Sequence, residues 1–199
     1  MKNKQYLIAD ARKEQIIKAA IEVLRDSGYV NTSLSKIASK AKTSTGLISY
    51  HFSGKEDLMN NILVYLVEDE KAFIKGRVEN EQTYLGKLMA FVEAGIEYRD
   101  KYRGNITALF EIVFNVRTPD NVPYFRMEMN PEEEVQVWLE EILSEGKKSN
   151  EFSDFDSRAV GMMIRGAISL AVSLPRNEND LGFKDYSEKV KENILKMIK

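Results

Sequence analysis

Residues 31–51 decide the fold, and they read NTSLSKIASKAKTSTGLISYH. Asn31-Thr32-Ser33 offers side-chain oxygens that can cap a helix. The helix that follows carries its apolar residues on one face, at Leu34, Ile37, Ala38 and Ala41. After a brief turn at Lys42-Thr43-Ser44, a second short helix is predicted over about Thr45–His51. The stretch therefore predicts two short helices joined by a tight turn.

Two such helices bury little surface of their own and need a third helix to pack on. The preceding segment, about Asp10–Ser27, predicts that helix, and Gly28 suits the position just after its end. Its apolar residues recur at helical spacing, at Ile16, Ile17, Ala20, Val23 and Leu24. Residues 1–55 are thus predicted to form a three-helix head.

The rest of the chain, residues 56–199, continues the helical pattern. Ser53-Gly54-Lys55-Glu56 fits a capping box in which Ser53 and Glu56 bond to first-turn amides, and it opens a long helix. Further helices are predicted over about Thr83–Tyr102, Ile106–Val116, Pro131–Ser144, Asp156 or Ser157 to near Pro175, and Tyr186–Ile198. The helix over Pro131–Ser144 is predicted to be capped by Asn130 and to end at Gly146. The segment Thr118–Asn130 is predicted to be an irregular connection. The predicted fold is all-α, a head continued into a C-terminal bundle, with about nine to ten helices in total.

Composition excludes several classes of protein. The 199 residues contain no Cys and a single His, His51, so a zinc site or a Ser/His catalytic pair is not expected. We expect no cofactor and no enzyme activity. No apolar run is long enough for a signal peptide or a membrane-spanning helix, and we expect a cytoplasmic protein.

Charge is divided unevenly along the chain. Residues 1–55 carry ten Lys or Arg and four Asp or Glu, a net charge of +6, whereas residues 56–199 carry 19 and 27, a net charge of −8. A positive end on an acidic body is expected when one part meets phosphate. Chance clustering on a solvated face is the alternative, so charge alone does not decide the function.

The three-helix arrangement places the helix over Thr45–His51 in the major groove of DNA as a recognition helix. Small hydroxyls can reach base edges or phosphates, Gly46 allows close backbone approach, and Lys55 with the next helix's free amides forms an anion site. His51 can donate a hydrogen bond to phosphate, or it can pack at the edge of the head instead. The residues predicted to contact DNA are Thr32, Ser33, Lys42, Thr43, Ser44, Thr45, Gly46, Ser49, Tyr50, His51 and Lys55.

These residues resemble a known family. Ile16-Ile17, Gly28-Tyr29, Thr32-Ser33-Leu34, Ile37-Ala38, Ser44-Thr45-Gly46-Leu47-Ile48-Ser49-Tyr50-His51-Phe52 and Lys55-Glu56 are similar to the TetR/AcrR family of bacterial regulators over about Arg12–Leu63. Lys42 stands where members often have glycine, so a left-handed turn there carries a cost. The resemblance implies a homodimer on a palindromic operator, a ligand cavity in residues 56–199, and repression relieved by a small hydrophobic molecule.

The bundle offers candidate ligand and dimer residues. A cavity could be lined by Phe91, Tyr98, Tyr102, Phe110, Phe114, Trp138 and Met162, although an ordinary core would look the same. Glu93, Glu97 and Glu111 could complement a cationic ligand, or could simply lie on a solvated face. A dimer interface is predicted on Pro131–Ser144 and Asp156–Leu174, through Trp138, Ile142, Gly161, Gly166 and Leu170, with burial inside one subunit as the alternative.

Three other functions remain open at this point. A helical adaptor could bind an acidic partner through the same basic end. An enzyme is disfavoured because the chain lacks Cys, has one His and shows no paired carboxylates. A regulator of the same fold that activates transcription, or that binds no ligand, is compatible with every feature above.

Overall fold

The computed structural model describes residues 2–126, 131–174 and 182–199, with side chains for all of these except residues 2–8 and 131–133. Within those ranges the chain forms nine α-helices and two short 3₁₀ helices, and the one strand-like feature is an isolated bridge between Arg117 and Pro123. The prediction of an all-α fold with about nine to ten helices is therefore confirmed.

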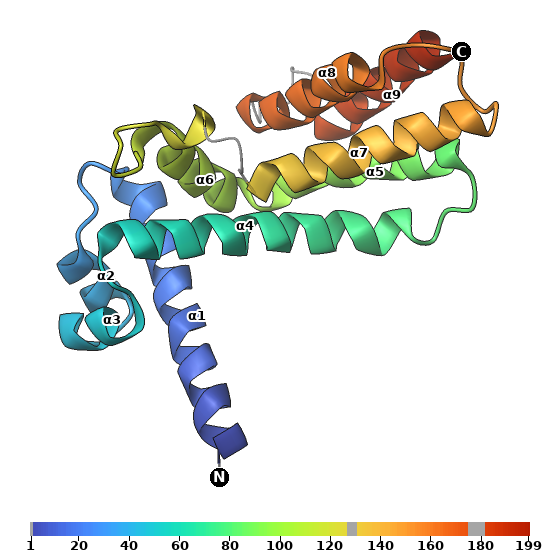
Figure 1. Ribbon diagram of the computed structural model, residues 1–199. Coiled ribbons are helices and arrows are strands. Elements are labelled where there is room, and N and C mark those ends of the chain that lie inside the picture. The colour runs from blue at the N-terminus through green and yellow to red at the C-terminus, as the bar shows by residue number, and fades with distance from the viewer. Residues whose placement is uncertain (1, 127–130, 175–181) are drawn as a thin grey trace. The chain divides into compact units, whose positions relative to one another are not determined.

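The helices follow one another as shown in Figure 1. They are α1 (Lys2–Ser27), α2 (Leu34–Lys40), α3 (Thr45–His51), α4 (Lys55–Val78), α5 (Tyr84–Lys101), α6 (Arg103–Asn115), η1 (Tyr124–Arg126), α7 (Pro131–Lys148), α8 (Ser157–Leu170), η2 (Ala171–Ser173) and α9 (Phe183–Ile198).

The chain divides into two compact units. Unit 1 comprises Met1–Leu66 and Gly104–Asn130, and unit 2 comprises Val67–Arg103 and Pro131–Lys199. The units differ from a simple division at residue 55, because the first part of α4, nearly all of α6 and the loop after it join the head.

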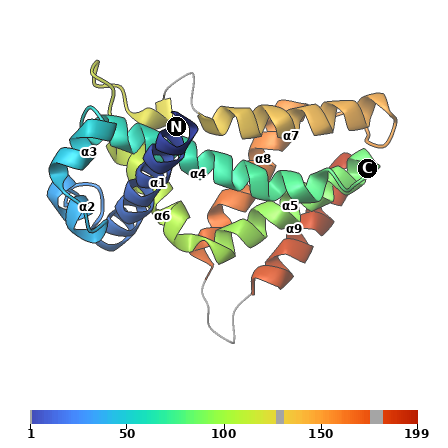
Figure 2. The same ribbon diagram turned by 90° about the horizontal axis from the view of Figure 1, so that it is seen from below.

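Unit 1 is organised around α1. Helices α2 and α3 lie side by side next to it (Figure 1), and the α1 residues Ile16, Ala20 and Leu24 are buried. In unit 2 the central helix is α5, which contacts α7, α8 and α9 (Figure 2). Because α5 has neighbours on several sides, most of its residues from Leu88 to Arg99 are buried.

Most predicted helix bounds are close to those observed. The recognition-helix prediction, Thr45–His51, matches α3 at both ends. Helix α1 begins at Lys2 rather than at Asp10, since residues 2–9 contain no Gly or Pro to stop it. Helix α9 begins at Phe183, three residues before the predicted start. The predicted cap Asn130 and the predicted helix end at Pro175 lie outside the described residues.

The predicted capping box at the start of α4 is wrong in its partner. The helix begins at Lys55, so Asp57 rather than Glu56 occupies the third helical position. The Asp57 carboxylate accepts a hydrogen bond from the Ser53 N–H at 2.8 Å. One residue of difference in the helix start therefore decides which acidic side chain satisfies this amide.

The predicted end of the next long helix is also wrong. Helix α7 continues through Gly146 to Lys148, and Asn150 rather than Gly146 takes the left-handed conformation after it, with φ of 60°. Gly146 serves packing instead. A Cβ atom at this position would overlap the ring of Phe152, which folds back against the helix.

No helix in the described parts of the chain is both long enough and apolar enough to cross a membrane.

Gly146→Ala is expected to destabilise the protein by about 1–3 kcal/mol, because the added methyl group forces Phe152 out of its buried position. Thermal or urea unfolding of the full chain measures the change. The matched control is Gly76→Ala in α4, where nothing lies within 4 Å of the added Cβ. That substitution should leave stability unchanged or raise it by up to about 1 kcal/mol. Equal effects of the two substitutions would contradict the packing role of Gly146.

Candidate functional site

The head is held together by apolar residues from all of its short helices. Ile37 of α2 and Ile48 of α3 are fully buried, and Phe52 directly after α3 is 2% exposed. The carbonyl of Ala41, at the end of α2, accepts a hydrogen bond from the Gln15 side chain of α1 at 2.8 Å. Burial of one face of α3 leaves its opposite face to solvent.

The turn between α2 and α3 is tight and left-handed. Lys42 has a φ of 50°, which lies in the left-handed region. The Lys42 and Thr43 amides donate to the carbonyls of Ser39 and Ala38 at 3.2 and 2.9 Å, and so close the end of α2. A left-handed conformation costs a non-glycine residue about 1–2 kcal/mol. The head therefore tolerates local strain in order to set the angle between α2 and α3.

The exposed face of α3 carries the predicted DNA contacts. Ser44 caps the helix by accepting from the Leu47 N–H at 3.1 Å, and its side chain remains exposed. Tyr50 is 80% exposed and meets the His51 ring edge-on at a centroid distance of 5.1 Å. Thr43 and His51 are half-buried. The exposed members of the predicted set are Ser33, Lys42, Ser44, Thr45, Gly46, Ser49 and Tyr50.

The N-terminus of α2 presents a second polar group. Ser33 is exposed and accepts from the Lys36 N–H at 3.3 Å. Lys36 itself is exposed, and its ammonium group donates to the Asn31 carbonyl at 2.8 Å. The sequence analysis did not include Lys36 among the candidate contacts. Its position one turn into α2 was the available signal.

Thr32 is a correction to the predicted DNA set. Its side chain is only 3% exposed, and its hydroxyl donates to the Gly28 carbonyl at 2.7 Å. The hydroxyl therefore closes the end of α1 instead of facing outward. The sequence alone could not separate Thr32 from Ser33, because both precede α2 and both carry a hydroxyl group.

Lys55 also differs from its predicted role as an exposed phosphate anchor. Its ammonium group is half-buried, donates to the Tyr29 carbonyl at 2.9 Å, and lies 3.9 Å from the centroid of the Tyr29 ring. Burial lowers the pKa of Lys55 and raises that of the Tyr29 hydroxyl. In this conformation Lys55 ties the start of α4 to the turn after α1.

Glu111 of α6 holds the same turn from another side. Its carboxylate accepts from the Tyr29 N–H at 2.8 Å and lies 3.4 Å from the position of a Cβ atom on Gly28. The prediction that Glu111 either meets a cationic ligand or lies on a solvated face is wrong, because the residue is half-buried with a backbone amide as its partner. Tyr29 is 82 residues away in sequence, so no local pattern could reveal the contact.

The predicted ligand residues do not form one cavity. Phe91 and Tyr98 are closed core residues at 0% and 1% exposure, and the Tyr98 hydroxyl donates to Asp69 at 2.7 Å. The Tyr102 ring meets Phe73 edge-on and lies tilted against Tyr98 in the same cluster. Met162 and Phe114 are wrong as lining residues because they are 61% and 59% exposed. Phe110 and Phe114 belong to unit 1, where they pack in a row with Phe125.

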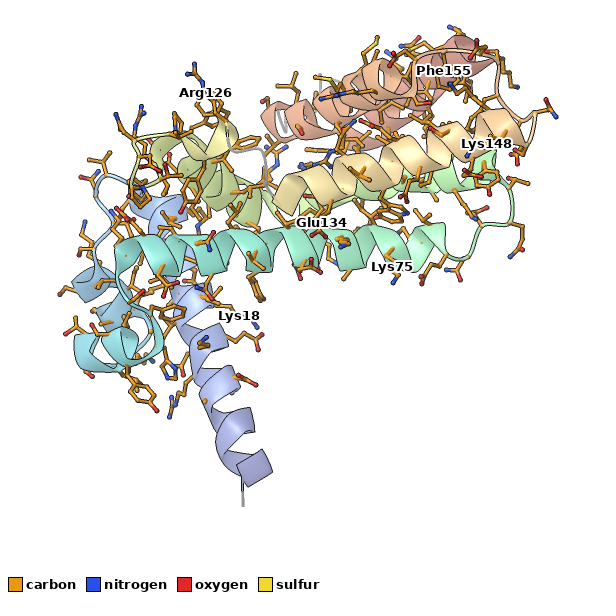
Figure 3. All side chains as sticks on the ribbon, in the orientation of Figure 1. Lys18, Lys75, Arg126, Glu134, Lys148 and Phe155 are labelled. Carbon is orange, nitrogen blue, oxygen red and sulfur yellow. The ribbon has the colours of Figure 1, made fainter. Side chains whose placement is uncertain are left out.

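Unit 2 contains a different open cavity, a groove of about 650 Å³. Trp138 is the one predicted ligand residue that lines it, and the Trp138 ring packs edge-on against Phe91 at 5.3 Å. Lys75 and Lys71 of α4 lie along the groove, and Lys71 pairs with Glu134 of α7 at 2.7 Å (Figure 3 labels Lys75 and Glu134). The remaining lining residues are Val78, Glu79, Glu81, Gln82, Tyr84, Lys87, Glu141, Ile142 and Glu145.

Four of the five predicted dimer residues fall into two groups, and the fifth, Trp138, is half-buried and lines the groove. Gly166 and Leu170 of α8 are exposed, together with the apolar residues Val137, Met162 and Met163. Gly161 and Ile142 are buried within the chain. A Cβ atom on Gly161 would lie 2.8 Å from Gln136, so this glycine allows α7 and α8 of one chain to approach closely. For Gly161 and Ile142 the intrasubunit alternative is the correct one.

Metal binding has little support in the described residues. No group of three or more His, Cys, Asp or Glu side chains among them could hold an ion.

Comparison with known proteins separates the head from the rest of the chain. Residues 16–62 match the family model of the bacterial regulatory proteins of the tetR family. The chain is 31% identical over 88 residues to the HTH-type transcriptional regulator BetI of Pectobacterium atrosepticum, covering 43% of this chain and 45% of that protein. It is 33% identical over 72 residues to the regulator HbdR of Aromatoleum sp. strain CIB, covering 36% of this chain and 31% of HbdR. The matched part spans less than half the length of either relative.

Solved structures extend the similarity of fold to nearly the whole chain. A tetR-family regulatory protein from Rhodococcus RHA1 aligns with a TM-score of 0.78 and 20% identity, over 94% of this chain and 96% of that one. FadR from Bacillus subtilis, solved in complex with stearoyl-CoA, aligns with a TM-score of 0.76 and 23% identity, over 94% and 99% of the two chains. These identities establish the fold and no more.

Glu111→Ala is expected to destabilise the protein by about 1–3 kcal/mol, because it leaves the part-buried Tyr29 N–H without its charged acceptor. Hydrogen exchange at the Tyr29 amide and thermal unfolding measure the effect. Glu111→Gln, which keeps an acceptor oxygen, should recover part of the loss. The control is Glu14→Ala, which removes only an exposed pair with Lys18 and should change stability by less than about 0.5 kcal/mol. Unchanged exchange at Tyr29 in Glu111→Ala would refute the contact.

Proposed function

We propose that this chain, whose residues 16–62 match the family model of the tetR family of bacterial regulatory proteins, is a homodimeric transcriptional repressor of that family which a small ligand releases from DNA. The observation that carries the proposal is the exposed polar face of α3, supported by a buried apolar face and a net charge of +6 on residues 1–55. Such a regulator acts on DNA in the cytoplasm.

Helix α3 enters the major groove in this proposal. Ser49 and Tyr50 are exposed on it and offer hydroxyl groups to base edges, while Thr45 and Gly46 allow the first turn to approach closely. Lys42 before the helix and Lys36 on α2 have exposed side chains that can neutralise phosphates on either side of the groove. The hydroxyl groups of Ser49 and Tyr50 thus contact the bases, and the phosphate contacts of Lys42 and Lys36 fix the position of the head on the DNA.

A second copy of the chain completes the site. One seven-residue helix provides too little contact for specific binding, whereas two heads one helical turn of DNA apart bind a palindromic site. The exposed apolar residues of α7 and α8, among them Val137, Met163 and Leu170, are the proposed dimer surface. Gly166 is exposed on the same helix and would let two backbones approach closely.

The proposed ligand site is the groove of unit 2. Its volume of about 650 Å³ falls within the range of small-molecule sites, and Trp138, Tyr84 and Ile142 supply apolar surface. The similar fold of FadR was solved with stearoyl-CoA, so a fold of this kind can take up a long apolar chain. This supports a hydrophobic ligand for the present chain.

Helix α4 is the proposed connection between ligand and head. It runs without a break from Lys55, which holds Tyr29, to Lys71 and Lys75 on the groove. Ligand binding that shifts α4 would change the spacing of the two heads and weaken DNA binding. A ligand that releases DNA while the distance between the heads stays constant would rule this mechanism out.

The salt dependence of DNA binding tests the proposed function. Affinity for duplex DNA should fall steeply between about 50 and 200 mM salt, and Lys42→Gln should lower the slope of log K against log salt by about one, because one phosphate contact is lost. Fluorescence anisotropy with a labelled duplex measures both quantities. Lys196→Gln, on an exposed position of α9, is the matched control and should leave the slope unchanged. Binding that is insensitive to salt would favour an adaptor that binds a protein.

A further inference from the structure

Three charged groups lie together in the interior of unit 2, and their charges do not balance. Glu70 of α4, Arg99 of α5 and Arg165 of α8 have side chains that are 3%, 1% and 11% exposed. One carboxylate oxygen of Glu70 lies 2.9 Å from Arg99 Nη1 and 3.1 Å from Arg165 Nη1. We name these three residues the buried triad. It holds two positive charges and one negative charge.

Every other ion pair of unit 2 among the described residues has at least one partner that is more than 40% exposed. Arg77 with Glu97 and Lys148 with Glu145 are examples in which each side chain is at least 40% exposed. Water screens such pairs, so an imbalance there has little consequence. In the buried triad water is excluded, and an uncompensated charge is costly unless another group neutralises it.

The unsatisfied donors of Arg99 mark where a neutralising group is missing. Among the described residues, Arg99 Nε has no hydrogen-bond acceptor, and Nη1 approaches Glu70 without hydrogen-bond geometry. Asp69, which precedes Glu70 in α4, accepts a hydrogen bond from the Tyr98 hydroxyl at 2.7 Å, and no ion pair joins it to Arg99 in the described residues. An arginine presents its donors as a fork that suits a carboxylate or phosphate. Within the part of the chain that the structure describes, Arg99 thus has two donors, Nε and Nη1, without a hydrogen-bond acceptor, in a cluster with a surplus positive charge.

The two arginines favour the charged form of the Glu70 carboxyl group. Burial by itself would raise the pKa of this carboxyl group, but Arg99 and Arg165 outweigh burial and lower it. Glu70 therefore stays ionised, and the surplus of one positive charge persists.

We propose that the ligand of unit 2 carries an anionic head group, a carboxylate or a phosphate, and that Arg99 binds this group with Arg165 in support. The inference rests on the proposed function only in taking unit 2 as the ligand-binding part. It adds the chemical class of the ligand, a group whose single negative charge balances the buried triad. The triad does not line the groove of about 650 Å³, so it is a separate binding position within unit 2. Glu70 keeps the two guanidinium groups together while the ligand is absent.

The test is thermal unfolding of the full chain without DNA, in the presence of hexanoate, octanoate or decanoate. The matched neutral probes are hexanol, octanol and decanol, and sodium chloride at equal concentration reports binding of a simple ion. At least one carboxylate should raise the unfolding midpoint by about 2–4 °C more than its alcohol and more than chloride. Alcohols or chloride that stabilise the protein as well as the carboxylates would overturn the proposal.

Two variants of the buried triad should change the affinity for carboxylates in opposite directions, which a purely structural role of the triad would not produce. Arg99→Met should abolish the preference for carboxylate, whereas Glu70→Gln should raise carboxylate affinity about tenfold, because it increases the surplus charge. Arg77→Met removes the same charge from an exposed pair of the same unit and should change nothing. A preference that survives in Arg99→Met, or weakens in Glu70→Gln, would contradict the assignment.

Arg165→Met tests the same assignment if Arg99→Met does not fold. It leaves the balanced pair of Glu70 and Arg99, so the ligand-free protein should fold, yet its carboxylate affinity should fall about tenfold. Full carboxylate affinity in this folded variant would also overturn the proposal. Because no DNA is present, these outcomes are separate from the salt-dependent DNA binding that tests the proposed function.

Discussion

The head depends on the burial of a few aliphatic side chains between α1 and two helices of seven residues each. Helices this short are unstable alone, because nucleating a helical turn costs more than a few hydrogen bonds return. Ile37 and Ile48 are fully buried against the rest of the head, and this packing is what keeps α2 and α3 folded. It also absorbs the strain of Lys42 and turns the polar face of α3 outward.

The turn at Tyr29 shows how the head is fixed on its other side. Its N–H donates to Glu111 of α6 and its carbonyl accepts from Lys55 of α4, so one peptide segment is bonded to two helices. Both partners are half-buried, which makes each of these hydrogen bonds stronger than it would be in water. A shift of α4 or α6 therefore has to move the end of α1, and with it the helices that pack on α1.

The sequence was sufficient wherever the determining interaction is local. The predicted turn at Lys42-Thr43-Ser44 joins α2 to α3, and the predicted start at Asp156 or Ser157 is that of α8, which Asp156 caps; both follow from a residue and its near neighbours. It failed where a distant residue decides. The sequence predicts a helix end at Gly146, but this glycine instead makes room for Phe152, which folds back from the loop after α7. The sequence also predicts that Met162 faces the interior, whereas its side chain is exposed on α8.

The candidate site was predictable to a similar degree. The periodicity of apolar residues predicts α3 and its polar face. It cannot distinguish Thr32 from Ser33, because these two differ in the direction in which the hydroxyl group points, and the folded backbone determines that direction. The buried triad was beyond prediction, since charged residues on α4, α5 and α8 look like members of solvated faces until the helices are packed together. Ion pairs between helices carry no periodic signal in sequence.

The most direct test of the account is to select the DNA that the full-length protein retains from a pool of random-sequence duplexes. The account predicts enrichment of an inverted repeat whose half-sites lie one helical turn apart, and loss of that enrichment when Ser49 and Tyr50 on the exposed face of α3 are both replaced by Ala. Retention of duplexes without any shared sequence, or the same inverted repeat with the α3 variant, would contradict it.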